Sequence, residues 1–224
     1  MSYPGIFSKD FFMVYKGMFQ INSLKKTDKM AYIYLSSICI NGLNHSYANL
    51  KELSQLFGIS RPTFKVVVNR LEEAELVEKI GQGNKFYIIN NEDLNLRGNF
   101  FFMHYAVLRT DKITPRQKLI YAYLLSRSDR ESMIAEVSIK SIAKNCAIRD
   151  DINIREDINQ LVLKGLITKK LLNKKYKGRL QYGKYQYKCL QLPSAILEEQ
   201  NNNSSGSIQS GAIFDSIDDF FKSF

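Results

Sequence analysis

The chain has 224 residues, of which 45% are hydrophobic and 12% aromatic, and it carries a formal net charge of +10. This composition is typical of a folded protein, and no apolar run reaches the roughly 20 residues of a membrane-spanning helix, so we expect no membrane segment. A basic protein of this size favours polyanionic partners, with nucleic acid ahead of anionic lipid.

The first predicted helix belongs to a segment that occurs twice. The run LKKTDKMAYIYLSS from Leu24 corresponds to ITPRQKLIYAYLLS from Ile113, an offset of 89 residues. The same offset carries residues 50–59 onto 139–148, and after one extra residue it becomes 90. Upstream, FFMVY and FFMHY are also 90 residues apart. The sequence therefore predicts one module used twice, and a unit of about 90 residues can bury its own core.

Each copy is expected to open with an apolar helix. In the second copy, the run from Thr114 to Gln117 predicts a capping box with Pro115 at the first helical position. Copy one has Lys25 where the capping threonine would stand, so the start of its helix is marked less clearly.

A helix-turn-helix follows in copy one. Apolar residues between positions 50 and 57 have helical spacing, and Gly58 ends this helix because glycine accepts the left-handed conformation of a tight reversal. Ser60 is a good N-cap for a second helix that begins with an arginine-proline pair. That helix turns Phe64 and Leu71 toward one side, with two valines between them.

A β-hairpin completes each copy. In copy one, GQGN at residues 81–84 separates two short β segments, which is typical of a hairpin. Helix, helix-turn-helix and hairpin together form a winged helix. In copy two the hairpin is longer, with a loop at residues 173–182, and it contains eight cations and no acid between Gly165 and Leu197.

The predicted fold class is α+β, mainly helical, with two tandem winged helix-turn-helix domains and a flexible C-terminal tail. We expect the first winged-helix domain at residues 1–97 and the second at 98–196. A flexible linker would occupy residues 197–211, and an acidic, aromatic peptide residues 212–224.

The second helix of a helix-turn-helix enters the major groove of DNA with its N-terminal residues. Asn69 is suited to adenine, and Lys65 or Arg70 to guanine or phosphate. An outward Val66 is suited to a thymine methyl group, and the alternative is an ordinary amphipathic helix with one exposed valine. The candidate DNA ligands of copy one are Ser60, Arg61, Thr63, Lys65, Val66, Asn69 and Arg70 on the helix, and Gln82, Asn84 and Lys85 in the wing.

The corresponding helix of copy two begins with Asp150 and Asp151, which repel phosphate, so we expect weaker base reading there. Its basic wing would supply most of the attraction to DNA. Alternatively, one copy pairs with another subunit in a homodimer and only the other copy reads bases. The candidates of copy two are Asn153 and Arg155 on the helix and Lys169, Lys170, Lys174, Lys175, Lys177 and Arg179 in the wing.

Residues for catalysis are few, and we expect neither an enzyme nor a bound cofactor or metal. The three cysteines are widely separated and lack the spacing of a metal site, which favours buried, reduced thiols in a cytoplasmic protein. The N-terminus also lacks the pattern of a secretion leader. The only histidines are His45 and His104, and His104 takes the place of Val14 in the repeat, which favours a packing role.

The tail combines acids with large apolar side chains. Five acids and one lysine after residue 197 give it a charge of −4 and leave +14 on the rest of the chain. The tail either folds back on the protein's own core as an amphipathic helix or docks in a partner's groove, with Phe214, Ile217, Phe220 and Phe221 as the partner-binding residues. Its spacing is similar to sliding-clamp binding peptides, and its acidic, Phe-terminated end is similar to the tails of single-stranded-DNA-binding proteins.

The run from Leu24 to Lys29, with LKELSQLFGIS and NRLEEAELVEK after it, resembles the winged helices of replication initiators and replisome organisers of Gram-positive plasmids and phages. The tandem arrangement is similar to plasmid initiators with two winged helices. The resemblance implies binding of repeated origin sites in double-stranded DNA and recruitment of a helicase, a loader or a sliding clamp. Two alternatives remain, namely a transcriptional regulator at a promoter site and a helicase-loader-type assembly scaffold.

Overall fold

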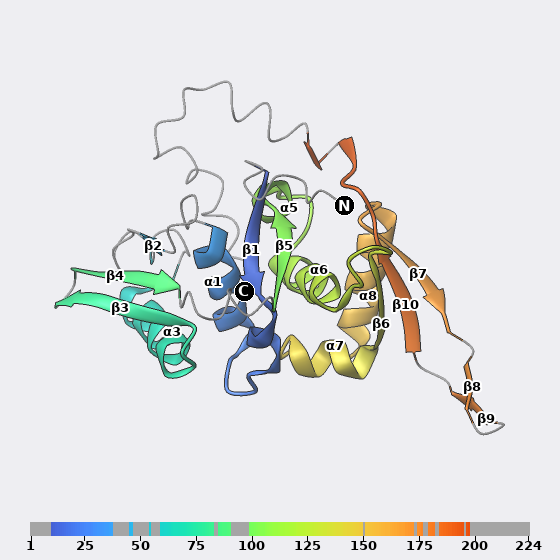
Figure 1. Cartoon of the computed structure of the whole chain (residues 1–224), viewed down its shortest axis with the longest axis horizontal. Helices are drawn as coiled ribbons and strands as arrows, with labels where there is room; N and C mark the ends of the chain where they lie inside the picture. Colours follow the sequence, from blue (N-terminus) through green and yellow to red (C-terminus); the bar gives the residue numbers. More distant parts are fainter. Residues whose placement is uncertain are drawn as a thin grey trace.

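The computed structural model describes residues 10–37, 45–46, 54, 59–82, 85–90, 99–149, 151–172, 174–176, 179–181, 184–194 and 196–197. These residues form a mixed fold of α-helices and small antiparallel sheets (Figure 1). None of the helices in those ranges has the length and apolar character that a bilayer crossing demands.

Copy one contains a short sheet and the helices that cover it. Its elements are β1 (Phe11–Tyr15), the 3-10 helix η1 (Lys16–Gln20), α1 (Lys26–Ser37), β2 (His45–Ser46), α3 (Arg61–Glu73), β3 (Val77–Gln82) and β4 (Lys85–Asn90). Strands β2, β4 and β3 form an antiparallel sheet in that order. Of the helix predicted between residues 50 and 57, Ser54 is helical and buried, and its remaining residues and Gly58 lie outside the described residues.

Copy two repeats this order with an additional hairpin. Its elements are β5 (Phe100–His104), α5 (Tyr105–Arg109), α6 (Pro115–Arg127), β6 (Ile134–Ser138), α7 (Ile139–Asn145), α8 (Asp151–Leu163), β7 (Ile167–Leu171), β8 (Lys174–Tyr176), β9 (Arg179–Gln181) and β10 (Lys184–Cys189). The sheet order β6, β10, β7 matches the order β2, β4, β3 of copy one. Strands β2 and β6, which complete these sheets, were not predicted from the sequence, and the loop predicted at residues 173–182 was wrong where it contains β8 and β9.

The helix starts follow the predicted capping chemistry. Thr114 and Gln117 form the complete capping box: Thr114 N donates to Gln117 Oε1 at 3.1 Å, and Gln117 N donates to Thr114 Oγ1 at 3.3 Å. Ser60 caps α3, since its hydroxyl accepts a bond from the backbone of Thr63. At α1 the carboxylate of Asp28 accepts a bond from the backbone N of Lys25 at 2.8 Å, so half of a capping box remains.

The two copies are joined by a ladder between their first strands. β1 pairs with β5 antiparallel, and Met13 lies opposite Phe102, its equivalent at an offset of 89. Beyond the ladder, Lys16 N donates to Asn99 O and Tyr105 N donates to Asp10 O, each at 2.9 Å. At the offset of 89, Lys16 is equivalent to Tyr105 and Asp10 to Asn99, so the two bonds are equivalent as well. An internal pseudo-two-fold axis therefore passes through the centre of the ladder.

The offset in these strands is 89, so the alignment of FFMVY with FFMHY at 90 was wrong by one residue. Val14 and Met103 are the equivalent residues, and both are fully buried at 0% exposure. His104 corresponds instead to Tyr15 and is half-buried at the end of β5. Its Nδ1 accepts a bond from Ala106 N at 3.0 Å, and its ring meets Phe11 edge-on at 4.7 Å. His104 thus caps α5 as well as packing.

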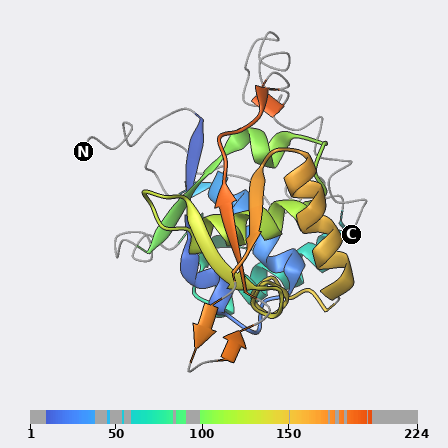
Figure 2. The same cartoon turned by 90° about the vertical axis from the view of Figure 1, so that its right-hand side faces the viewer.

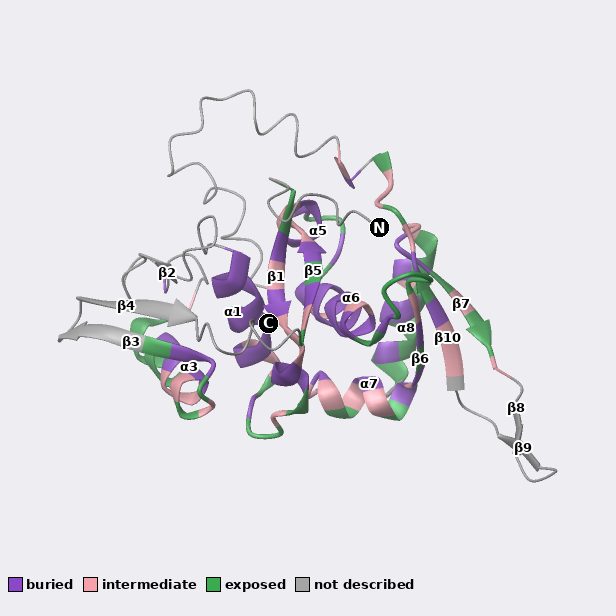
Figure 3. Ribbon diagram, viewed as in Figure 1, coloured by how far each residue is buried: buried purple, intermediate pink, exposed green. Residues whose placement is uncertain are grey.

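The core is continuous across the two copies. Buried residues of both halves belong to one apolar cluster, and Figure 3 shows α1 and α6 as mostly buried helices. Phe19 of copy one stacks edge-on against Tyr123 of copy two, with ring centroids 5.2 Å apart. Burying one such aromatic side chain contributes about 2–3 kcal/mol, so contacts of this kind fix the two copies together.

A buried lysine adds a polar bond to this junction. Lys29 is 1% exposed, and its Nζ donates to Phe19 O at 3.0 Å and to Asn145 O of copy two at 2.8 Å. Lys118, its equivalent, donates to Leu108 O at 2.7 Å, which is the carbonyl equivalent to that of Phe19. Burial lowers the pKa of Lys29 to about 8.

Candidate nucleic-acid interface

The N-terminal half of α3 presents most of the predicted DNA ligands of copy one. Ser60, Arg61, Thr63, Lys65 and Val66 are all exposed. Val66 is 49% exposed, so the outward direction expected for this valine is confirmed. Asn69 is half-buried, whereas the helical pattern predicted that it is exposed. The exposed face is therefore narrower than predicted and lies toward the start of the helix.

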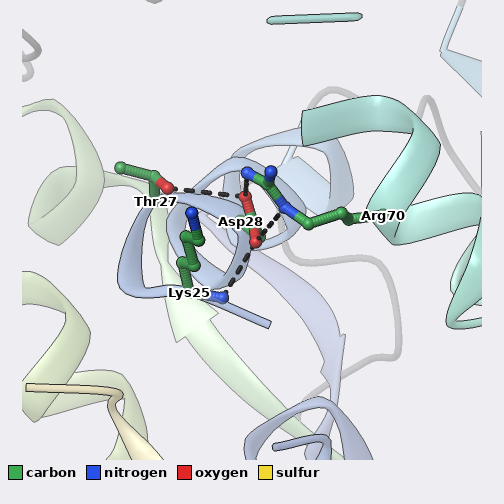
Figure 4. Close-up of polar contacts among 4 residues, drawn as sticks. All are labelled: Lys25, Thr27, Asp28 and Arg70. Atoms are coloured by element: carbon green, nitrogen blue, oxygen red, sulfur yellow. Dashed lines mark hydrogen bonds and ion pairs between the residues drawn. The ribbon is translucent and has the colours of Figure 1, made fainter. Parts of the chain in front are cut away.

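Arg70 lies at the inner edge of this face, and its guanidinium is bound to a buried carboxylate of the protein. Its Nε donates to Asp28 Oδ2 at 2.8 Å and its Nη2 donates to Asp28 Oδ1 at 2.6 Å (Figure 4). Asp28 is completely buried, and its hydrogen bonds raise the pKa of Arg70. Because releasing Arg70 to DNA would leave a buried carboxylate without its counter-charge, Arg70 is withdrawn as a DNA ligand.

Copy two has a comparable ion pair, but there the first helix supplies the base and the candidate recognition helix supplies the acid. Arg116 at the start of α6 forms an ion pair with Asp157 on α8, and Gln117 Nε2 donates to the other oxygen of that carboxylate at 3.2 Å. Asp157 is 3% exposed. In both copies, an ion pair thus ties the first turn of the first helix to the candidate recognition helix and fixes the direction of its exposed face.

The exposed face of α8 differs from that of α3. Asn153 and Arg155 are exposed, as their prediction as DNA ligands requires. Ile152 is 79% exposed and Leu163 is 77% exposed, at opposite ends of the helix. Asp151 is the first residue of α8, and Asp150 lies outside the described residues. The helix therefore combines few basic groups with bare apolar side chains.

The long hairpin of copy two carries the predicted basic wing. The paired strands β7 and β10 face the viewer in Figure 2, and β8 and β9 extend the hairpin beyond them. Lys170 is exposed, whereas Lys169 is half-buried with its Nζ 4.6 Å from the centre of the Tyr185 ring. Lys174, Lys175 and Arg179 lie on the extension, and Lys177 lies outside the described residues.

The short wing of copy one is described only in part. Gln82 lies opposite Lys85 at the end of the β3–β4 ladder, so the backbone brings these two candidates together. Asn84, which would stand between them, lies outside the described residues, and so do the candidate partner-binding residues of the tail, Phe214, Ile217, Phe220 and Phe221.

One basic cluster was not predicted from the sequence. Lys16 of copy one lies close to Arg127 and Arg130 of copy two, and its pKa is lowered by burial and then by these two guanidinium groups. Arg130 lies over the ring of Phe100 at 5.6 Å from its centre. No local pattern predicts this cluster, because Lys16 is more than a hundred residues from the two arginines along the chain.

The cysteines conform to expectation where they are described. Cys146 and Cys189 are buried free thiols, and burial raises the pKa of Cys189 to about 11. Cys39 lies outside the described residues. Among the residues that the structure describes, no group of histidine, cysteine or carboxylate side chains is arranged to hold a metal ion.

No protein-family model matches this sequence, and a search of curated proteins gives no significant match. Its function is therefore inferred from the geometry of the chain.

Proposed function

We propose that the chain is a double-stranded DNA-binding protein built from two winged helices, and that it acts as a replication initiator. The observation that carries the proposal is an order common to both copies: a first helix, a short strand, a candidate recognition helix and a hairpin, with the same sheet order. In this order, α3 and α8 are the recognition helices and the two hairpins are the wings.

The turns before the recognition helices support this assignment. Ile148 N donates to Ala143 O at 2.9 Å, and at the equivalent place Ile59 N donates to Ser54 O at 3.1 Å. The same closing bond therefore reverses the chain before α8 and before α3, as a helix-turn-helix requires. The exposed start of α3 provides hydroxyl, basic and apolar side chains that suit base edges and phosphates.

The pseudo-two-fold axis gives the proposal a geometric consequence. A dimer with two recognition helices related by a two-fold axis reads inverted half-sites. Here the axis is internal, and the β1–β5 ladder and shared core hold the two helices in one body. The expected target is an inverted pair of unequal half-sites at fixed spacing, read by one chain. Origin repeats of this form would bring several molecules together, and the tail would then recruit a helicase, a loader or a sliding clamp.

A second candidate function has one observation in its favour. The bare apolar side chains of α8, Ile152 and Leu163, suit contact with another protein subunit better than contact with phosphate. In that case α8 pairs subunits in a homodimer, and the chain is an assembly scaffold of the helicase-loader type. A transcriptional regulator remains the alternative in which the same winged helices bind a promoter.

Footprinting on the DNA that flanks the gene separates these functions. An initiator protects several copies of one site, a regulator protects a palindrome at a promoter, and a scaffold shows no sequence preference. Protection of repeated sites supports initiation. Uniform binding at every position would contradict specific DNA recognition.

A further inference from the structure

An apolar groove lies where the two copies meet the end of the described chain. It has a volume of about 1060 Å³ and is lined from β1, β5, α6, the loop before β6, and the segment that follows β10. Three of the eight large apolar side chains exposed in the described part of the chain line it, namely Phe11 at 47%, Phe102 at 37% and Met133 at 37%. Exposed apolar groups gathered in a hollow are typical of a binding site.

The rim of this groove, meaning Lys188 in its lining and Arg130 beside it, carries two positive charges against one negative charge from Glu131. Phe102, which lines the groove, stacks edge-on against Phe100 at 5.4 Å, and Arg130 lies over that second ring. Arg130 belongs to the cluster with Lys16 and Arg127. Lys188 is exposed and lines the groove itself, while Glu131 is the one acid among its lining residues. An occupant should therefore combine large apolar side chains with negative charge.

The chain carries such an occupant at its own C-terminus. The peptide AIFDSIDDFFKSF at residues 212–224 contains six large apolar side chains and three aspartates beside one lysine. Its apolar positions recur every three or four residues, so a helix would gather them on one side and leave the aspartates flanking them.

The path to the groove is short. Leu197 lines the groove, and the peptide follows after the 14 residues of positions 198–211. A random-coil linker of that length spans about 20 Å on average, so a peptide beyond it can return to the groove beside Leu197. Such a tether also holds the peptide at an effective concentration of the order of millimolar, so modest affinity suffices for docking.

We propose that the peptide of residues 212–224 docks in this groove of its own molecule, with its phenylalanines among Phe11, Phe102 and Met133 and its aspartates against the basic rim. The docked peptide covers the exposed apolar groups and neutralises part of the charge beside them. A replication protein that binds Phe220 and Phe221 must first withdraw them from the groove. Docking does not require DNA binding, so either proposal can fail while the other stands.

The absence of tryptophan allows a clean test. In the full-length chain with Phe221→Trp, the single indole reports on the surroundings of the tail. We expect its emission maximum at a shorter wavelength than that of the free peptide 212–224 with the same tryptophan, and several-fold weaker quenching by acrylamide. An emission and a quenching equal to those of the free peptide would overturn the proposal.

Groove variants locate the docking site. Phe102→Glu and Phe11→Glu, each in the tryptophan reporter, place a negative charge on an exposed groove position and should release the tail, with emission returning to that of the free peptide. Leu163→Glu is the matched control, since it charges an exposed leucine on α8 away from the groove, and it should leave the emission unchanged. Unaltered thermal unfolding of each variant shows that the fold persists, and one intact groove variant suffices.

Two outcomes would overturn the proposed site. If the buried emission survives both groove substitutions, the tail packs elsewhere on the protein. If the buried emission fades when the protein is diluted, the occupant is the tail of a second molecule. A supporting result is also expected: added salt at constant protein concentration should weaken docking of the tail, because the rim and the tail attract each other electrostatically.

Discussion

At the scale of single residues, Asp28 shows how the fold directs the proposed DNA-binding face. It is fully buried, it completes the first turn of α1 through Lys25 N, and it holds Arg70 with two hydrogen bonds (Figure 4). A charge in the interior is tolerated because each carboxylate oxygen has its donors. The rotation of α3 about its axis is thereby fixed, and Val66 is turned outward.

Removing this charge should destabilise the protein. Asp28→Asn cannot bind the guanidinium bidentately and leaves Arg70 unpaired, which should lower the free energy of unfolding by about 3 kcal/mol, the lower end for a broken buried pair because Arg70 keeps some contact with water. Urea unfolding followed by circular dichroism measures the change. Glu73→Gln removes an exposed acid from the same helix and should change the free energy by less than about 0.5 kcal/mol. Equal effects of the two variants would contradict the contribution of the Asp28–Arg70 ion pair to stability.

Val66 is predicted to recognise a thymine methyl group. Once a binding site is known, replacing each thymine in turn by uracil should reveal one position where the loss of the methyl costs about 0.8 kcal/mol, or a factor of about four in affinity. In Val66→Ser the same replacement should cost nothing, because the apolar partner is already gone. A uracil effect of the same size in both proteins would rule out this contact.

At the scale of elements, each copy has glycine at one of two equivalent turn positions and a residue with a Cβ at the other. Ala147, at the position of Gly58, has a φ of 53°, and Glu75, at the position of Gly165, has a φ of 56°. Each copy thus pairs one glycine with one residue in a left-handed conformation that costs a residue with a Cβ about 1 kcal/mol or more.

Glycine should therefore stabilise both strained positions. Ala147→Gly and Glu75→Gly should each raise the free energy of unfolding by about 0.5 kcal/mol, since the relief of strain exceeds the extra freedom of glycine in the unfolded chain. Thermal unfolding measures the gain. Ala143→Gly, inside α7, is the control and should lower stability by about 1 kcal/mol. Destabilisation at position 147 as large as at position 143 would show that the turn has another conformation.

The long wing should contribute non-specific attraction. Lys174→Ala with Lys175→Ala removes two cations from β8, which should weaken binding to every duplex and reduce the slope of log K against log salt by about two. Titrations at several salt concentrations measure the slope. Lys140→Ala with Lys144→Ala removes the same charge from α7, and it should alter the slope less. An unchanged slope in the wing variant would contradict its role.

Local signals predicted the longer helices and the main hairpins, whereas α5, the β8–β9 hairpin and the long-range contacts were not predicted. Thr114 and Ser60 mark helix starts through bonds to residues three positions away, and these are visible in the sequence. The strand β2 is only two residues long, too short for an alternating pattern, and the partner of Arg70 lies 42 residues earlier in the chain. The half-burial of Asn69 likewise depends on packing against other elements rather than on helical periodicity.

At the scale of the whole molecule, the duplicated sequence becomes one body with an internal axis. The ladder of β1 with β5, the ring of Phe19 against Tyr123 and the bond from Lys29 to Asn145 O all cross between the copies. The repeat predicted two similar units, but the pairing of their first strands was not visible in it. That pairing determines how the two proposed recognition helices are presented, because it sets the symmetry that relates them.

The most direct test of this account is hydroxyl-radical footprinting of the full-length protein, with its stoichiometry on the site measured in parallel. We predict that one molecule protects two segments in inverted orientation at constant spacing, with unequal base preferences in the two halves. Two segments in direct rather than inverted orientation under one molecule, protection of a single segment by one molecule, or binding without sequence preference would contradict recognition through an internal pseudo-two-fold axis.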